Sequence, residues 1–133
     1  MYGGFAGTEG ALDERSWSAN PTVIDGSARN VNWGPGWDTY GADHTIFIDN
    51  RGSNIRIDGF VITGGYADNT SGEASYRGTG GGGIFWRTFS ASNVIANCTI
   101  TGNYGTGSGN AVYILIPNGK FINCLITGNN GTG

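Results

Sequence analysis

The 133-residue sequence contains few charged residues, and their distribution excludes one class of partner. Charged residues make up 13% of the chain, about half the usual share, and all ten carboxylates lie at or before Glu73. After Glu73, only Arg77, Arg87 and Lys120 carry a formal charge. Because no cluster of lysine and arginine could follow a phosphate backbone, we expect no nucleic-acid partner.

Long apolar runs, proline and cysteine are also scarce. No apolar run approaches the roughly 18 residues of a membrane span, so we expect no transmembrane segment, and the first residues do not form a signal peptide. The 3 prolines exclude collagen and a proline-rich linker, and the 2 cysteines are too few for a disulfide framework. Glycine supplies 26 residues, and 38% of the chain is hydrophobic. This composition indicates one folded domain with many tight turns.

The chain contains an internal repeat. Three segments align without gaps, and each ends in Ile-Thr-Gly followed by glycine or asparagine: 57–65, 95–103 and 121–129. A second set of short apolar segments precedes them: 44–48, 82–86 and 110–114. The aligned segments are 38 and 26 residues apart, and a polar insertion at 66–80 accounts for the longer offset. Two short strands therefore recur in each repeat, separated by turns rich in glycine and asparagine.

This repeat predicts an all-β chain, because its apolar runs are short, alternate with period two and end in glycine or asparagine. A repeat of about 26 residues made of short strands is typical of a β-solenoid, in which each coil buries its inward side chains by stacking on the next. We predict a right-handed parallel β-helix of about three to four coils, forming a single domain over 1–133. Residues 1–43 form an irregular capping segment in this prediction, and residues 44–133 form the repeating coils.

The repeat alignment also predicts the core, because positions that stack in successive coils point to the same side. One inward ladder comprises Phe60, Cys98 and Cys124, and the adjacent one comprises Ile62, Ile100 and Ile126. Neighbouring coils would lie about 4.8 Å apart, whereas a disulfide prefers β-carbons that converge to about 3.8 Å. We therefore predict two reduced, buried thiols that behave as small hydrophobic groups.

Gly59, Asn97 and Asn123 occupy one corner of the predicted coils, just before these ladders. Glycine and asparagine tolerate the left-handed backbone that a sharp bend demands. Stacked asparagine amides can also hydrogen-bond to one another along the stack. The alignment therefore predicts a left-handed corner that an asparagine ladder reinforces.

Three segments, 81–84, 97–103 and 121–124, resemble right-handed parallel β-helix proteins of bacterial cell surfaces. They look like the Gly-Gly-Ile and Phe-x-x-Asn elements of polymorphic outer-membrane protein repeats, although Cys124 stands where that element has asparagine. The opening segment 2–9 is similar to that of secreted, pectate-lyase-like β-helices. The resemblance implies the β-helix fold and a protein that is extracellular or attached to the cell surface.

Polysaccharide lyases and hydrolases of this fold use carboxylates on an outer strand face, so the resemblance also raises catalysis. Asp49, Asp58 and Asp68 are the candidates, but an aspartate at a strand end also hydrogen-bonds its own turn backbone. No catalytic signature of the polygalacturonase or pectate-lyase kind is visible. We therefore predict a non-catalytic scaffold or adhesin-like binding module. The alternative is a polysaccharide lyase or hydrolase, or a piece of one, that uses outer-face aspartates.

Carbohydrate and calcium are the two ligands that the sequence suggests. Exposed aromatic rings stack on sugars, and the candidates for such a platform are Trp33, Trp37, Tyr66 and Tyr76. Clustered oxygens bind calcium, and the insertion supplies Asp68, Asn69 and Glu73. A solvated loop is the alternative interpretation of the insertion, and no other cofactor is expected.

The two ends of the predicted stack leave strand edges and core side chains uncovered. Open strand edges pair with other chains, and stacked repeats need their terminal faces covered. We therefore predict self-association through an open end or a flank of the stack, unless the chain is a fragment of a longer solenoid.

Overall fold

The structure is a computed structural model of the chain, and it describes residues 1–27, 42–48, 54–68, 80–89 and 91–132. The described part consists of short β-strands and one 3-10 helix, η1 (Leu12–Glu14). All of the paired strands run parallel. The prediction of an all-β chain with parallel strands is therefore confirmed. No helix within these residues is long and apolar enough to cross a membrane.

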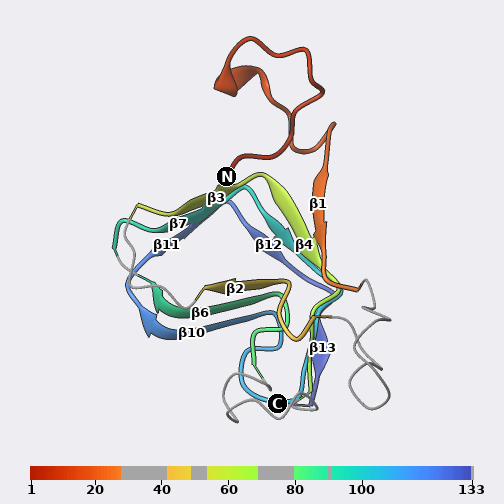
Figure 1. The fold of residues 1–133 in the computed structure, drawn as a ribbon, viewed down its shortest axis with the longest axis vertical. Coiled ribbons are helices and arrows are strands. Elements are labelled where there is room, and N and C mark those ends of the chain that lie inside the picture. Colours follow the sequence, from red (N-terminus) through yellow and green to blue (C-terminus); the bar gives the residue numbers. More distant parts are fainter. Residues whose placement is uncertain (28–41, 49–53, 69–79, 90, 133) are drawn as a thin grey trace, which may run out of the picture.

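The chain passes three times through the same four sheets, and each pass contributes one strand to each sheet (Figure 1). The first pass comprises β2 (Ile46–Ile48), β3 (Arg56–Asp58), β4 (Phe60–Thr63) and β5 (Tyr66–Ala67). The middle pass comprises β6 (Ile84–Phe89), β7 (Val94–Ala96), β8 (Thr99–Ile100) and β9 (Tyr104–Gly105). The last pass comprises β10 (Val112–Pro117), β11 (Lys120–Ile122), β12 (Leu125–Ile126) and β13 (Asn130–Gly131).

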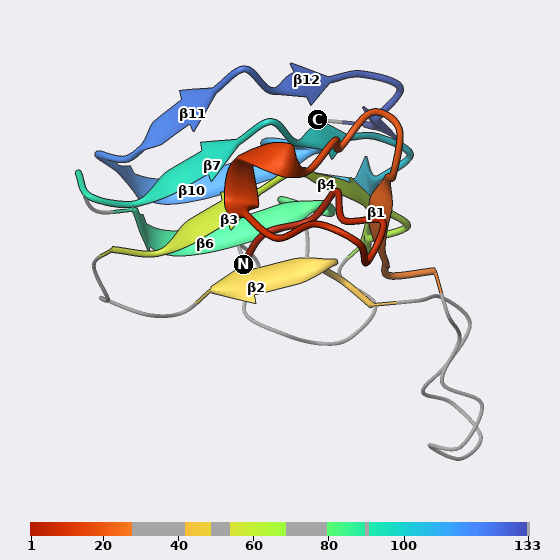
Figure 2. The same cartoon turned by 90° about the horizontal axis from the view of Figure 1, so that it is seen from above.

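The middle pass lies between the other two in every sheet (Figure 2). Three sheets have the orders β10-β6-β2, β11-β7-β3 and β13-β9-β5. The fourth has the order β1-β4-β8-β12, because β1 (Thr22–Asp25) adds to the first pass beside β4. Residues 1–43, expected to be irregular, therefore contain a strand. The sequence signal for this strand is the pair of β-branched residues Val23 and Ile24, and its four residues are half-buried and exposed in turn.

The strand register follows the repeat alignment. Ile62 pairs with Ile100, and Ile100 pairs with Ile126. The predicted corner is confirmed, because the backbone φ angles of Gly59, Asn97 and Asn123 are 80°, 51° and 50°. An L-residue with a β-carbon seldom adopts this left-handed backbone, which explains why only glycine and asparagine occupy the corner.

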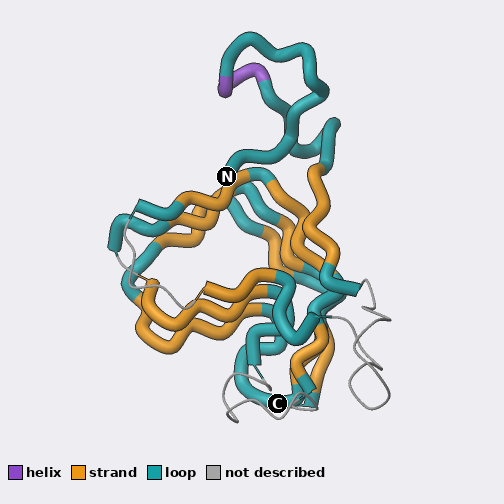
Figure 3. Tube along the Cα trace, viewed as in Figure 1, coloured by secondary structure: helices purple, strands orange, loops and turns teal. Residues whose placement is uncertain are grey.

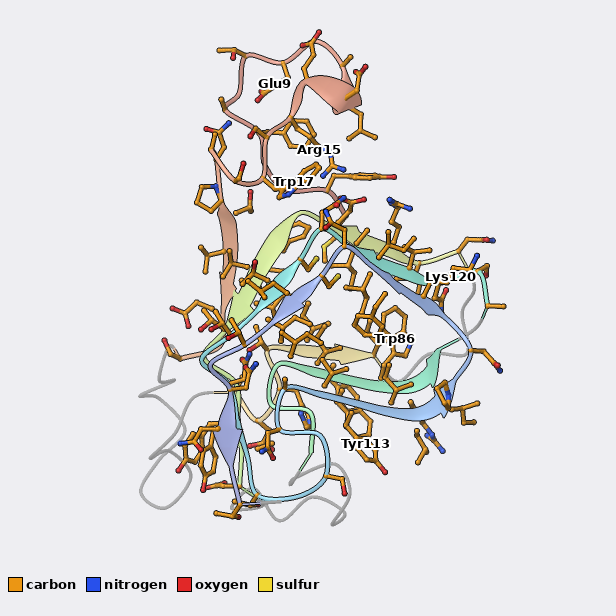
Figure 4. All side chains as sticks on the ribbon, turned by 180° about the vertical axis from the view of Figure 1, so that it is seen from behind. Glu9, Arg15, Trp17, Trp86, Tyr113 and Lys120 are labelled. Atoms are coloured by element: carbon orange, nitrogen blue, oxygen red, sulfur yellow. The ribbon has the colours of Figure 1, made fainter. Side chains whose placement is uncertain are left out.

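The core lies in the interior that three of the sheets surround (Figure 3), and Trp86 points into it (Figure 4). Its buried side chains are Ile57, Phe60, Ile62, Ile84, Trp86, Ile95, Cys98 and Ile100. Four of the six residues predicted for the inward ladders belong to this cluster. Of the other two, Cys124 packs against the cluster, and Ile126 lies in the last pass, where 50% of it is exposed.

Candidate functional site

The last pass forms the final strand of every sheet, so β10, β11, β12 and β13 together present one uncovered face that we call the open edge. Six large apolar residues of this pass are exposed: Leu115, Ile116, Phe121, Ile122, Leu125 and Ile126. Among the middle-pass residues whose side chains the structure describes, no large apolar residue is exposed. Apolar exposure of this kind is typical of an interaction surface.

At the pair of identical residues Ile100 and Ile126, the difference in exposure results from a missing neighbour and not from a change of residue type. Ile100 is 0% exposed, whereas Ile126, its register partner, is 50% exposed. Ile95 is likewise 0% exposed, and its partner Phe121 is 38% exposed. The middle pass is covered on both sides, and the last pass is covered on one side only.

The open edge contains few of the residues that block strand pairing. In natural proteins, charged side chains or proline on an edge strand prevent that strand from pairing with another chain. Lys120 is the only charged residue in the last pass, and Pro117 is its only proline. Strands β12 and β13 contain neither, so no charged residue or proline on these two strands opposes pairing with another strand.

A ladder of amide side chains runs along the left-handed corner and ends at the open edge. The Asn123 Nδ2 donates to the Asn97 Oδ1 at 2.8 Å, and the Asn97 Nδ2 donates to the Asp58 Oδ1 at 2.9 Å. This confirms the predicted hydrogen bonding between stacked asparagines. The amide side chains follow one another from pass to pass, and the last of them, Asn123, is exposed at the open edge.

At the other end, the chain's own N-terminal segment occupies the edge beside Asp58. Tyr2 forms a parallel bridge with Asp58, and the Gly3 N–H donates to the Asp58 carbonyl oxygen at 2.8 Å. The Arg15 guanidinium lies over the rings of Tyr2 and Trp17, 5.1 and 5.2 Å from their centroids (Figure 4). Within the described residues, the two ends of the stack therefore differ, because the N-terminal segment covers part of the first end and no described segment covers the last pass.

Asp58 is a structural carboxylate, although the sequence made it a candidate for catalysis. Its side chain is 0% exposed and forms ion pairs with Arg15 at 2.7 Å and with Arg56 at 2.6 Å. Burial raises the pKa of Asp58, but hydrogen bonds from Asn97, Arg15 and Arg56 together outweigh it and hold the pKa below its ordinary value. A substrate on the outer surface cannot reach this carboxylate, so the expectation of an outer-face Asp58 is wrong.

Of the other aspartates at the ends of strands, Asp25 and Asp68 lie within the described residues. Asp25 accepts a hydrogen bond from the Ser27 N–H at 2.8 Å, which is the turn role expected for an aspartate at a strand end. Asp68 follows β5 and is partly buried. Asp49 lies outside the described residues. The described part of the chain holds no group of three or more histidine, cysteine, aspartate or glutamate residues that could bind a metal ion.

The predicted ligand residues are brought together only in part. Tyr66 stacks on Tyr104 in the neighbouring pass, with ring centroids 4.5 Å apart and an interplanar angle of 12°. This pairing was not predicted, and its only sequence signal is the equal offset of the two residues after Ile-Thr-Gly. The remaining predicted ligand residues lie outside the described part of the chain: Trp33, Trp37, Asn69, Glu73 and Tyr76.

A second aromatic column lies on the sheet β10-β6-β2. Phe47 stacks on Phe85 at 5.2 Å, and Phe85 stacks on Tyr113 at 5.5 Å. His44 joins this column, with its ring 5.0 Å from that of Phe85 and its Nδ1 3.0 Å from the Gly81 carbonyl oxygen. Because each ring packs against the face of the next, this aromatic column stabilises the association of successive passes.

Comparison with known proteins assigns no family to the chain. No protein-family model matches it, and no curated protein or solved structure matches it. The likeness to pectate-lyase-like and polymorphic outer-membrane proteins therefore remains a hypothesis.

Proposed function

We propose that the chain is a right-handed parallel β-helix that serves as a non-catalytic scaffold and binding module of a secreted or cell-surface bacterial protein. Its binding surface is the open edge, and its partner there is a second copy of the chain. The parallel sheets, with one strand from each pass, support the fold. The residue patterns at 81–84, 97–103 and 121–124 support the bacterial surface setting.

The contrast between Ile100 and Ile126 carries this proposal. These identical residues occupy paired positions, yet one is 0% and the other 50% exposed. A further strand laid on β12 would cover Ile126 as β12 covers Ile100. Removing this apolar surface from water drives association. The unpaired backbone N–H and C=O groups of the edge strands orient the second copy.

A second copy fits the open edge better than it fits the first end. At the first end, β1 already pairs with β4, and Tyr2 already pairs with Asp58. Two open edges meeting across a two-fold axis would bury the same residues on both copies, as a symmetric dimer requires. Lys120 is the only charge in each last pass, so little repulsion opposes this arrangement.

Light scattering over a concentration series tests the proposal, with the variant Ile126→Lys. We expect the unaltered chain to reach the mass of a dimer and Ile126→Lys to remain a monomer with an unchanged strand spectrum by circular dichroism. Val23→Lys is the matched control, because Val23 is 54% exposed on β1, away from the open edge. The proposal is wrong if the chain stays monomeric throughout, or if Ile126→Lys associates as strongly as Val23→Lys.

Carbohydrate binding and polysaccharide cleavage stay predictions. The stack of Tyr66 on Tyr104 is the one described feature that favours a sugar platform. Retention of the chain on immobilised polysaccharides, compared with Tyr104→Ala, tests this platform. Release of reducing or unsaturated sugar ends, with and without calcium, tests for cleavage that uses Asp49 or Asp68.

A further inference from the structure

Two free cysteines lie in neighbouring passes at the end of the stack that is uncovered. Cys98 directly precedes β8, Cys124 directly precedes β12, and these strands pair with Leu125 opposite Thr99. The two cysteines therefore continue one register, each after a left-handed asparagine. Adjacent strands lie about 4.8 Å apart, which is within the range of α-carbon distances that a disulfide spans.

Each thiol contacts its own pass and the pass before it. The Cys98 Sγ lies 3.1 Å from the Ala96 carbonyl oxygen and 3.8 Å from that of Ile57. The Cys124 Sγ lies 3.4 Å from the Ile122 carbonyl oxygen and 3.5 Å from that of Ile95. Cys124 therefore reaches the middle pass, to which Cys98 belongs.

The two thiols differ in access and in acidity. Cys98 is 1% exposed, whereas Cys124 is partly exposed at the open edge. Interaction with the Cys98 thiol lowers the pKa of Cys124, whereas interaction with Cys124, together with burial, raises the pKa of Cys98. Because a soluble reagent reaches the partly exposed thiol more readily than the buried one, and the thiolate is the reactive form, we expect Cys124 to react first.

We propose that Cys98 and Cys124 form an oxidation site at which a small soluble disulfide converts the two thiols into one cross-strand disulfide. The Cys124 thiolate attacks one sulfur of the reagent, which forms a mixed disulfide and releases one reagent thiolate. The Cys98 thiol then passes its proton to the released thiolate and attacks the Cys124 sulfur, which expels the second reagent thiolate. Two protein thiols are oxidised, and one reagent disulfide is reduced to two thiols.

The product would tie the last pass covalently to the middle pass. The predicted resting state of two reduced thiols is retained, since both cysteines are free in the structure. The site does not depend on the proposed function, but the two interact. A second copy on the open edge would cover Cys124, so oxidation should slow when the chain associates.

The test uses the full chain, reduced and folded, with oxidised glutathione at low protein concentration. We expect intact mass spectrometry to show the loss of two hydrogen atoms and peptide mapping to join Cys98 to Cys124. Cys98→Ser should stop at the mixed disulfide on Cys124, and Cys124→Ser should stay unmodified over the same time. Circular dichroism of each variant establishes that it is folded.

A parallel reaction in denaturant isolates the role of the fold. Disulfide closure should be at least tenfold faster in the folded chain, because the register holds the two sulfurs together. Equal rates in the two conditions would overturn the proposal, as would a folded chain that stays reduced or stops at the mixed disulfide. Modification of folded Cys124→Ser at the unaltered rate would overturn the assigned order of attack.

Discussion

The middle pass and the last pass repeat one pattern in two environments. Both contain a left-handed asparagine, a cysteine and an isoleucine at paired positions, and both end in Ile-Thr-Gly-Asn. The middle isoleucine is 0% exposed, and the last is 50% exposed. The repeated residues therefore determine where each strand pairs, whereas burial depends on whether another strand follows.

This difference distinguishes substitutions that break the fold from those that affect association. A residue of the middle pass contacts a neighbour on each side, so its loss disturbs two interfaces. The paired residue of the last pass has one such neighbour. Paired variants at the same repeat position therefore measure what a second covering strand contributes.

The largest effect is expected at the paired isoleucines. Ile100→Asp places a charge among buried apolar side chains, so it should cost about 5 kcal/mol or more and prevent folding. Ile126→Asp should cost about 1 kcal/mol, because water reaches the new carboxylate. Urea unfolding followed by circular dichroism measures both, and a folded Ile100→Asp variant would show that the assigned inward face is wrong.

Asp58→Asn should have the next largest effect. It removes the carboxylate that neutralises the Arg15 guanidinium, whose side chain is only 8% exposed. Loss of one partner of a buried ion pair costs about 3 kcal/mol. Asp25→Asn is the matched control at an exposed turn, and its unfolding free energy should change by less than about 1 kcal/mol.

The pH dependence of stability provides a second measurement on Asp58. Its pKa in the folded chain lies below the ordinary value, so its contribution is complete above about pH 4 and is lost as the pH falls through the folded pKa. Denaturation midpoints should therefore drop more steeply with acid in the unaltered chain than in Asp58→Asn. Parallel acid profiles for the two chains would contradict this account of the ion pairs.

The asparagine ladder should show a smaller contrast between the two passes. Asn97→Ala loses hydrogen bonds on both sides and forces alanine into a left-handed backbone, at a cost of about 2 kcal/mol. Asn123→Ala meets the same backbone strain but loses only one ladder hydrogen bond, so it should cost about 1 kcal/mol less than Asn97→Ala. Asn97→Gly and Asn123→Gly relieve the backbone strain, so they measure the loss of the hydrogen bonds alone. Equal losses of unfolding free energy at the two positions would contradict the role of the ladder.

The smallest effect is expected at an outward position. Leu125 pairs with Thr99, so Leu125→Thr restores the middle-pass residue on the outer face. Stability should change by less than about 0.5 kcal/mol, and self-association should weaken less than it does in Ile126→Thr. Ile126→Thr alters the inward position beside it, so association should weaken by at least tenfold. Sedimentation of the two variants compares them directly, and reversed effects would mean that the two faces are misassigned.

Much of the strand arrangement could be predicted from the repeat alone. The shared Ile-Thr-Gly and the corner residues Gly59, Asn97 and Asn123 determine register locally, because each pass bends at the same point. The ion pair between Arg15 and Asp58 could not be predicted, since it joins residues 43 positions apart with no repeat relation. Uncovered core side chains at the ends of the stack were predicted, but the exposure of Ile126 itself was not, because the repeat shows which way its side chain faces and not which pass ends each sheet.

The candidate site was less predictable than the fold for the same reason. Aromatic residues and aspartates were selected by type, whereas their roles depend on contacts across passes. Tyr66 stacks on Tyr104, and Asp58 forms ion pairs with two arginines and accepts a hydrogen bond from Asn97. The repeat predicted open ends in general, and the order of strands in the sheets identifies the last pass as the open edge.

The most direct test of the open edge is amide hydrogen exchange along β12 as protein concentration rises. Leu125 and Thr127 donate their N–H groups to Cys98 and Ile100 of the middle pass, so the N–H of Ile126 between them faces the open edge. We predict that Ile126 exchanges rapidly in dilute solution and becomes protected when the chain associates, while Leu125 and Thr127 stay protected throughout. Association that leaves Ile126 unprotected would contradict the assignment of the open edge as the binding surface.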